Sequence, residues 1–213
     1  MIKQRRADTA LKPKNICRAK YINMWLIIYF AIVAVSVAVD QITKIAAVKH
    51  LADINCIEVI PGALEFKYIE NDGMAFGLLS GARWIFMSVS VIAILAMVVY
   101  LIKWRPASKF ACIGISLIIG GGIGNMIDRL FFTSVLDPEQ GGKVVRDFIY
   151  FCGFGDLWVW IFNVADACVC VGGAMLFIWC VIAMIKEYKL EKQKKNAKPE
   201  EAEAAEAQDE KSE

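Results

Sequence analysis

The stretch NVADACVCVGGAMLFIWCVIAMI, residues 163–185, decides the fold class of this chain. It is apolar along almost its whole length and carries one charge, at Asp166. About twenty helical residues that rise about 1.5 Å each cross the roughly 30 Å hydrocarbon core of a bilayer. An ionised side chain at membrane depth costs about 2.5–3.5 kcal/mol, so a retained one predicts a functional role. The stretch therefore predicts a transmembrane helix in which Asp166 has a functional role.

Three further stretches are long and uncharged enough to span a membrane. The chain has 213 residues, of which 58% are hydrophobic, and the apolar residues are gathered in blocks instead of amphipathic stripes. Backbone groups in hydrocarbon must be paired within the segment, which favours helices. We predict an all-α integral membrane protein with four transmembrane helices, at about residues 21–39, 84–102, 110–127 and 163–185.

The distribution of Lys and Arg predicts the orientation of these helices. Basic residues concentrate in three segments, residues 1–20, 103–109 and 186–195. By the positive-inside rule these segments are cytoplasmic, so both termini are inside. The chain then divides into a basic cytoplasmic segment (1–20), a membrane domain (21–185) and a charged cytoplasmic tail (186–213), which we expect to be disordered or a solvated helix. A net charge of +2 gives no reason to expect a nucleic-acid partner.

The two remaining connections, residues 40–83 and 128–160, are expected on the outer side. Leu64 to Tyr68 alternates apolar and polar residues, and Asn71-Asp72-Gly73 is a turn signal, so we expect a small extracytoplasmic β-hairpin or sheet and a surface loop. Trp158 and Trp160 are typical of an aromatic belt at the membrane surface. Their position places Asp166 near the outer surface instead of the bilayer centre.

The cysteine and histidine content argues against a metal centre. Seven cysteines form no C-x-x-C pair, and His50 is the single histidine, so we predict no metal site, no cofactor and no Cys/His catalysis. Cys56 and Cys152 both fall in outer segments and could meet there. Apolar packing is the favoured role for most of the cysteines.

Polar residues at the outer ends of two helices predict a chemical site. Asn125 and Asp128 are i,i+3 neighbours, and Asn163 and Asp166 repeat that spacing on the last helix, while Asp147 arrives from the loop between them. Carboxylates held close together do not ionise independently, so one keeps a proton while the other acts as a base. Such a pair can activate water against an amide and protonate the leaving nitrogen. The nearby glycines, Gly120 and Gly124, have the spacing of close helix packing.

Five short motifs occur in order between these helices. They are Asp40-Gln41-Ile42-Thr43-Lys44, Asn71-Asp72-Gly73-Met74-Ala75-Phe76, Gly124-Asn125-Met126-Ile127-Asp128-Arg129, Val144 to Phe148, and Phe162 to Asp166. Together they resemble the bacterial lipoprotein signal peptidases, the type II signal peptidases. The resemblance extends from about Asp40 to Asp166.

The resemblance implies a function and a set of roles. It implies a membrane aspartic endopeptidase, a hydrolase that cleaves the signal peptide from diacylglyceryl-modified prolipoproteins on the amino side of the lipidated cysteine. It assigns catalysis to Asp147 and Asp166, and substrate binding or support of the site to Asp40, Lys44, Asn71, Gly73, Ala75, Phe76, Asn125, Asp128, Arg129 and Asn163. It implies the bacterial cytoplasmic (inner) membrane as the location, with the site near its extracytoplasmic face, and lipid-modified precursors and membrane lipids as partners. One four-helix unit contains every assigned residue, so we expect a monomer.

Two features depart from the family pattern. Arg146 stands directly before Asp147, where the family often has a valine, and the connection after Asp128 carries the additional stretch Thr133 to Lys143. An inward-pointing Arg146 would lower the pKa of Asp147. We expect Arg146 to face water or lipid headgroups instead.

A rival hypothesis is a small proton- or cation-coupled carrier that uses Asp166 and Asp128. It accounts for an acid within the membrane beside glycines. It also predicts polar residues through the depth of the helix bundle and leaves Asp147 without a role. The inner halves of the four predicted helices are nearly free of ionisable residues.

Overall fold

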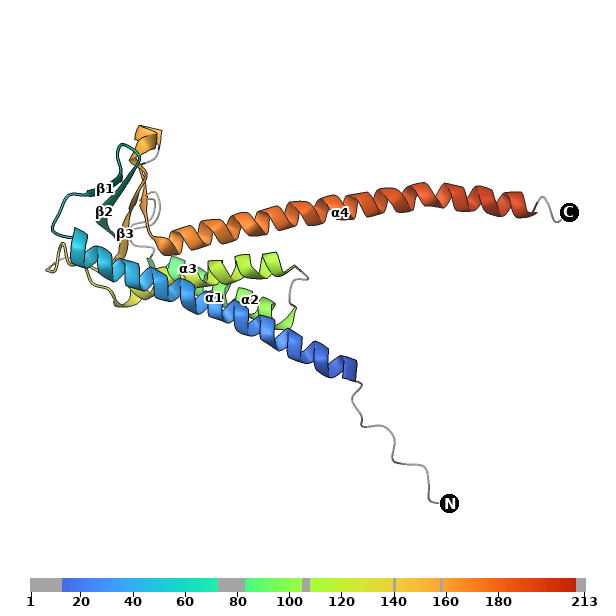
Figure 1. Ribbon diagram of the computed structural model, residues 1–213, viewed down its shortest axis with the longest axis horizontal. Coiled ribbons are helices and arrows are strands. Elements are labelled where there is room, and N and C mark those ends of the chain that lie inside the picture. The colour runs from blue at the N-terminus through green and yellow to red at the C-terminus, as the bar shows by residue number, and fades with distance from the viewer. Residues whose placement is uncertain (1–12, 73–82, 105–107, 140, 158, 210–213) are drawn as a thin grey trace, which may run out of the picture.

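The computed structural model describes residues 13–72, 83–104, 108–139, 141–157 and 159–209. Its long helices are α1 (Pro13–Leu51), α2 (Arg83–Lys103), α3 (Lys109–Phe131) and α4 (Val164–Asp209). Figure 1 shows α2 and α3 lying beside α1, a small sheet at one end of the helices, and α4 running far beyond the others at the opposite end. The mostly helical architecture with a small β element is as the sequence predicts.

Among the described residues, three helical segments are long and apolar enough to cross a membrane. They are Met24–Leu51, Lys109–Phe131 and Val164–Gln193. The apolar part of α2 is shorter and runs from Met87 to Lys103. The chain is therefore a multi-pass membrane protein by the length and composition of its helices.

Helix α1 ends later than the sequence predicts. The predicted span stops at residue 39 because Asp40 and Lys44 suggest the start of a loop, whereas α1 continues to Leu51. Asp40 and Lys44 are i,i+4 neighbours on this helix, their charged groups lie 2.9 Å apart, and both side chains are fully buried. Because each charge has a partner, the helix continues into a region that hydropathy assigns to water.

Helix α3 packs at the centre, against α1, α2 and α4. A Cβ added to Gly120 would lie 2.6 Å from the Ser36 Cβ on α1, and one added to Gly124 would lie 2.5 Å from Asp40 Oδ2. No side chain fits at either distance. The prediction that Gly120 and Gly124 allow close helix packing is confirmed.

The segments that connect α1 to α2 and α3 to α4 form one antiparallel sheet, which is one of the two forms, hairpin or sheet, that the sequence predicts. Within the described residues its strands are β1 (Ile57–Ile60), β2 (Leu64–Asn71), β3 (Val145–Tyr150) and β4 (Ile161–Phe162), in the order β1-β2-β3-β4. The hairpin turn between β1 and β2 lies at residues 61–63, where Gly62 has φ = 67°. The turn signal at residues 71–73 follows at the end of β2, and its Gly73 lies outside the described residues. Asp147 therefore lies on a strand and not in a loop. A 3₁₀ segment, Cys152–Leu157, connects β3 towards β4.

The sheet rests on one end of the helices. Ala47 and Leu51 of α1 pack with Tyr68 of β2 and Phe148 of β3 in a small apolar cluster. The additional stretch after α3 folds back on itself, because Lys143 Nζ donates to the Phe131 carbonyl at 2.9 Å and Thr133 bridges to Lys143. Strand β3 is thus held between helices, β2 and this loop, and its residues 145–148 are all buried.

Two other expectations can be compared with the structure. Helix α4 continues as far as Asp209, so residues 186–209 take the helical form of the two forms, disordered or helical, that their composition predicts. Cys56 is exposed, Cys152 is half-buried, and both are free thiols.

Candidate active site

Asp166 is held by the N-terminus of α4. Asn163 precedes the helix, its carbonyl accepts from the Ala167 N–H at 3.1 Å, and its side-chain Oδ1 accepts from the Asp166 N–H at 3.0 Å. In return the Asp166 Oδ2 accepts from the Asn163 backbone N–H at 3.2 Å. This reciprocal pattern is a capping box, which satisfies two N–H groups that the helix leaves unpaired. The carboxylate of Asp166 also benefits from the positive end of the helix dipole.

Asp147 projects from β3 into the same region. Its side chain is buried, with the residue 2% exposed, and each of its oxygens accepts from an asparagine amide. Asn163 Nδ2 donates to Oδ1 at 2.6 Å, and Asn71 Nδ2 of β2 donates to Oδ2 at 3.1 Å. Asn163 therefore contacts both aspartates, one through its amide and the other through its backbone and Oδ1.

The two carboxyl groups are coupled electrostatically. Burial raises the pKa of Asp147, the negative charge of Asp166 raises it further, and the pKa reaches about 7 despite the opposing effect of the amide donors and Lys44. A carboxyl group with such a pKa exchanges its proton near neutral pH. The arrangement can thus present a protonated acid beside a carboxylate, which is the requirement for acid–base hydrolysis.

Asn125 of α3 connects this pair to a buried lysine. Its Nδ2 donates to Asp166 Oδ1 at 2.7 Å, and its Oδ1 accepts from both Asn163 Nδ2 at 3.0 Å and Lys44 Nζ at 2.9 Å. The amide orientation is set by these partners, because the ammonium group only donates and the carboxylate only accepts. Asn125 is therefore fixed in one position.

Asp40, Lys44 and Asp128 form a buried charged layer beneath the pair. Lys44 Nζ lies 2.9 Å from Asp40 Oδ2 and 3.4 Å from Asp128 Oδ2, and all three side chains are fully buried. Asp40 Oδ1 also accepts from the Ala165 N–H at 2.9 Å, which ties α1 to the first turn of α4. These charges hold together the helices that carry the aspartates.

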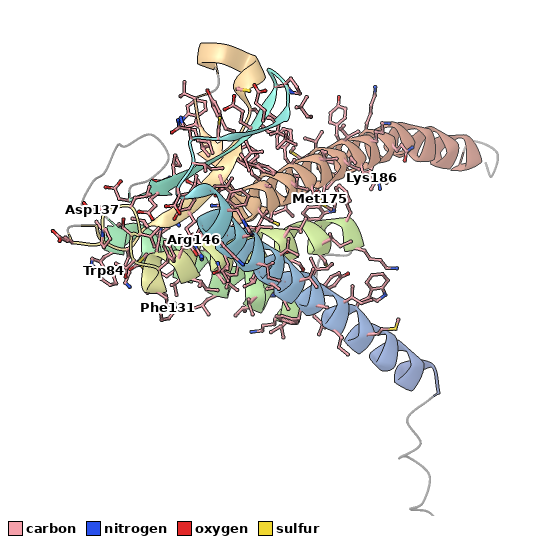
Figure 2. All side chains as sticks on the ribbon, turned by 60° about the vertical axis from the view of Figure 1, so that its left-hand side comes forward. Trp84, Phe131, Asp137, Arg146, Met175 and Lys186 are labelled. Atoms are coloured by element: carbon pink, nitrogen blue, oxygen red, sulfur yellow. The ribbon has the colours of Figure 1, made fainter. Side chains whose placement is uncertain are left out.

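Arg146 does not face water or lipid headgroups, and that expectation is wrong. The residue is 5% exposed, and its guanidinium donates to Asp128 Oδ1 at 2.6 Å and to Asp128 Oδ2 at 3.1 Å. Figure 2 shows Arg146 where the sheet meets the helices. Successive residues of a strand point to opposite faces, so Arg146 and Asp147 are directed apart. Arg146 is paired with Asp128, and the main influences on the pKa of Asp147 are its burial, Asp166, the two asparagine amides and Lys44.

The remaining candidate residues fall in two groups. Arg129 is half-buried on α3, where its Nη1 donates to the Asn125 carbonyl at 3.3 Å. Gly73, Ala75 and Phe76 lie outside the described residues. The structure therefore brings Asp40, Lys44, Asn71, Asn125, Asp128, Asp147, Asn163 and Asp166 into one connected set of hydrogen bonds and ion pairs.

Two further residues that support the site region, Gln41 and Glu70, were not among the candidates from the sequence. Gln41 donates from Nε2 to Asp40 Oδ2 at 3.1 Å and to Asp128 Oδ1 at 3.2 Å, and its Oε1 accepts from Arg146 at 2.9 Å. Glu70 of β2 accepts from the Val135 N–H at 2.8 Å and from the Ser134 hydroxyl, and so fixes the additional loop. Gln41 lies inside the Asp40-to-Lys44 motif, which was its one visible signal.

The burial of Asp128 argues against the carrier hypothesis. A cation-binding carboxylate must exchange its partner, whereas Asp128 is fully buried and already paired with Arg146 and Lys44. Removing such a partner is strongly unfavourable. Asp128 is thus a structural anion in this arrangement.

The amino-acid sequence of this chain is similar to sequences of known proteins. Residues 32–182 match the signal peptidase (SPase) II family. A lipoprotein signal peptidase of Clostridium acetobutylicum is 37% identical over 71% of this chain and 92% of its own length, and one of Halalkalibacterium halodurans is 34% identical over 80% and 99%.

Solved structures of bacterial membrane enzymes have a similar fold. A bacterial membrane enzyme determined by the in meso method at 2.3 Å superposes with a TM-score of 0.60 and 31% identity, over 75% of this chain and 88% of the other. A second, at 1.9 Å, has the same score and identity. The matched residues 32–182 include both aspartates, and the chain belongs to the signal peptidase II family.

Proposed function

We propose that this chain is a membrane aspartic endopeptidase that removes the signal peptide from lipid-modified prolipoproteins, with Asp147 and Asp166 as its catalytic pair. The observation that carries the proposal is that Asn163 donates to both carboxyl groups, through its Nδ2 to Asp147 and through its backbone N–H to Asp166, within one electrostatically coupled site. The relatives named lipoprotein signal peptidase support the substrate class. Cleavage falls on the amino side of the diacylglyceryl-cysteine.

The proposed reaction is acid–base hydrolysis without a covalent intermediate. Asp166 as the carboxylate takes a proton from water, the water oxygen bonds to the peptide carbonyl carbon, and Asp147 as the acid gives its proton to the nitrogen. The C–N bond then breaks, leaving a carboxylic acid on the signal peptide and an amine on the lipidated cysteine, and the acid loses its proton as proton exchange with solvent restores the starting charges of the two aspartates. The titration that governs this step belongs to the pair of carboxyl groups.

The asparagines and Arg129 hold the reacting groups in this proposal. Asn71 and Asn163 fix the two oxygens of Asp147, and Asn125 fixes Asp166. The Arg129 guanidinium offers donors to a substrate carbonyl. The resemblance to the family gives Gly73, Ala75 and Phe76 a role in substrate binding.

The proposed topology has four transmembrane helices, α2 included, with both termini in the cytoplasm. The basic segments 1–20, 103–109 and 186–195 support this orientation. The sheet and the catalytic pair then lie at the extracytoplasmic face of the bacterial cytoplasmic (inner) membrane. A signal helix can reach them laterally from the bilayer, and a monomer is sufficient.

The test is cleavage by the full chain in lipid vesicles. The substrate is a diacylated prolipoprotein, and the matched control is the same precursor with serine at the lipidated position. We expect mass spectrometry to find cleavage of the lipidated precursor alone, with the lipidated cysteine as the new N-terminus. Equal cleavage of both precursors, or a cut at another bond, would contradict the proposed specificity.

A further inference from the structure

We propose that Arg146 is a positioning residue whose guanidinium, bound to Asp128 and Gln41, fixes strand β3 against the helices and thereby sets the place of the Asp147 carboxyl group opposite Asp166. The inference deepens the proposed function and rests on it. It assigns a role to a residue that departs from the family pattern and touches neither proposed catalytic carboxyl group.

Arg146 binds two different helices. Its Nη2 donates to Asp128 Oδ1 on α3 at 2.6 Å and to Gln41 Oε1 on α1 at 2.9 Å, while Nε donates to Asp128 Oδ2 at 3.1 Å. The planar guanidinium matches a carboxylate with two parallel donors, so this contact fixes direction as well as distance. One side chain therefore sets the strand against both α1 and α3.

The backbone of Arg146 is fixed by the same carboxylate. Its N–H donates to Asp128 Oδ2 at 3.1 Å, so Asp128 binds the main chain and the side chain of one residue. The next Cα along the strand is that of Asp147, about 3.8 Å away. Any shift of this backbone is passed directly to Asp147.

The two faces of the β2–β3 pair make different contacts. On one face Asn71 reaches Asp147, and on the other Glu70 lies opposite Arg146 in the strand register. Glu70 binds the additional loop after α3, and the ring of Phe132, the C-cap residue of α3, covers the guanidinium at 4.2 Å. The face opposite Asp147 is thus an anchoring layer of the strand.

The four buried charged groups around Arg146 have no net charge. Asp40 and Asp128 are two buried anions, and Lys44 and Arg146 are two buried cations bound to them. Simple neutralisation of Asp128 would require only a positive charge near it. The positioning role requires the fork of donors, which lysine does not have. The two roles therefore predict different results for Arg146→Lys.

The experiment compares Arg146→Lys with the parent chain in vesicles on the diacylated precursor. We expect kcat to fall by roughly 10- to 100-fold, as for a displacement of about 1 Å at a reacting group, and KM to stay within about threefold. The decline of kcat at alkaline pH should also move to lower pH, because a displaced Asp147 is more hydrated and farther from Asp166. Parental kcat and pH profile in Arg146→Lys, or a change in KM alone, would overturn the proposal.

The pH profile is interpretable because the substitution conserves charge. The charged groups around Asp147 are Asp166 on α4, Lys44 and Asp40 on α1, Asp128 on α3 and Arg146 on its own strand. Arg146→Lys leaves the charge of each of them unchanged. A shift of the profile then reports the position of Asp147.

Two further variants keep the test decisive. Gln41→Leu removes the neutral partner of Arg146 and leaves the ion pair of Arg146 with Asp128, so it should lower kcat by a smaller factor than Arg146→Lys does. An unchanged kcat in Gln41→Leu would contradict the role of this contact. That result can be obtained even if Arg146→Lys does not accumulate. Lys143→Met removes a cation on the approach to β3 that binds the Phe131 carbonyl and Thr133, and should retain kcat within about twofold. An equal loss in Lys143→Met would overturn the specific role of Arg146.

Asp147→Asn separates failure of this inference from failure of the proposed function. If Asp147→Asn cuts the precursor as fast as the parent, the catalytic assignment fails. If Asp147→Asn is inactive while Arg146→Lys retains its kcat and pH profile, only the positioning role fails.

Discussion

Asn163 and Asp166 bind each other twice across the first turn of α4. The Asp166 N–H donates to Asn163 Oδ1 at 3.0 Å, and the Asn163 N–H donates to Asp166 Oδ2 at 3.2 Å. The side-chain Nδ2 of Asn163 donates to Asp147 Oδ1 at 2.6 Å. One residue thus caps the helix, orients one carboxyl group and holds the other.

Substitution of Asn163 should separate these roles. Serine is as good an N-cap as asparagine, whereas alanine is not, so Asn163→Ser should be more stable than Asn163→Ala by about 1 kcal/mol in detergent-induced unfolding. Both variants lose the amide bond to Asp147 and should lose roughly 100-fold in kcat. Parental turnover in Asn163→Ser would show that the cap alone matters.

The pH dependence of turnover should report Asp147. With a pKa of about 7, Asp147 keeps its proton below neutral pH and loses it above, so kcat should fall by about tenfold per pH unit on the alkaline side. The measurement is kcat in vesicles across the neutral and alkaline range. A constant kcat well above pH 7 would exclude Asp147 as the acid.

Stability should depend on the same group with a defined sign. The pKa of Asp147 is about 7 in the folded protein and near 3.9 when unfolded, so between about pH 4 and 7 the folded state binds more protons. Stability from this group is therefore full below about pH 4 and declines as pH rises towards 7. Asp147→Asn should flatten this part of the unfolding free energy measured against pH.

The sequence predicted the helices and the candidate aspartates because both depend on local patterns. The block from residue 163 to 185 is recognisable by hydropathy alone, and Asn163 with Asp166 is visible as an i,i+3 pair. The end of α1 was not predictable in this way. Asp40 and Lys44 are compatible with a buried helix only because Asp128 and Asn125 on α3 complete their contacts, which is a long-range fact.

Strand β3 shows why the role of Arg146 was missed. Alternation along a strand usually places one face in water, so a charged residue beside a buried Asp147 is expected outside. Here both faces are covered, by the aspartate pair on one side and by Asp128, Gln41 and Phe132 on the other. The pairing of β2 with β3 joins residues more than seventy positions apart, and no local signal in the sequence specifies it.

Lys44 should be essential for stability. Lys44→Met leaves Asp40 and Asp128 buried with less positive charge, so the unfolding free energy should fall by about 3–5 kcal/mol. The double variant Lys44→Met/Asp40→Asn removes one of the uncompensated anions and should recover part of the loss. If the double variant were less stable than Lys44→Met by the full cost of Asp40→Asn alone, the two charges would not be coupled.

Gly124 should not tolerate a larger side chain. In Gly124→Ala the new Cβ on α3 would meet Asp40 Oδ2 at 2.5 Å and the Ala165 Cβ at 3.3 Å, so α1 and α4 must move away from α3. We expect a loss of about 1–3 kcal/mol in unfolding free energy. Gly173→Ala on α4 is the matched control, because nothing lies within 4 Å of the added Cβ. Equal losses in the two variants would contradict close packing at Gly124.

In the proposed mechanism Asp147 and Asp166 together perform the cleavage. The most direct measurement is the single-turnover rate on a diacylated precursor for Asp147→Asn and Asp166→Asn, at equal amounts of inserted protein. Asp137→Asn, in the exposed part of the loop after α3, is the matched control. We predict a loss of at least about 1,000-fold in each of the first two variants and parental cleavage in the third. Full cleavage by either Asp147→Asn or Asp166→Asn would contradict the account.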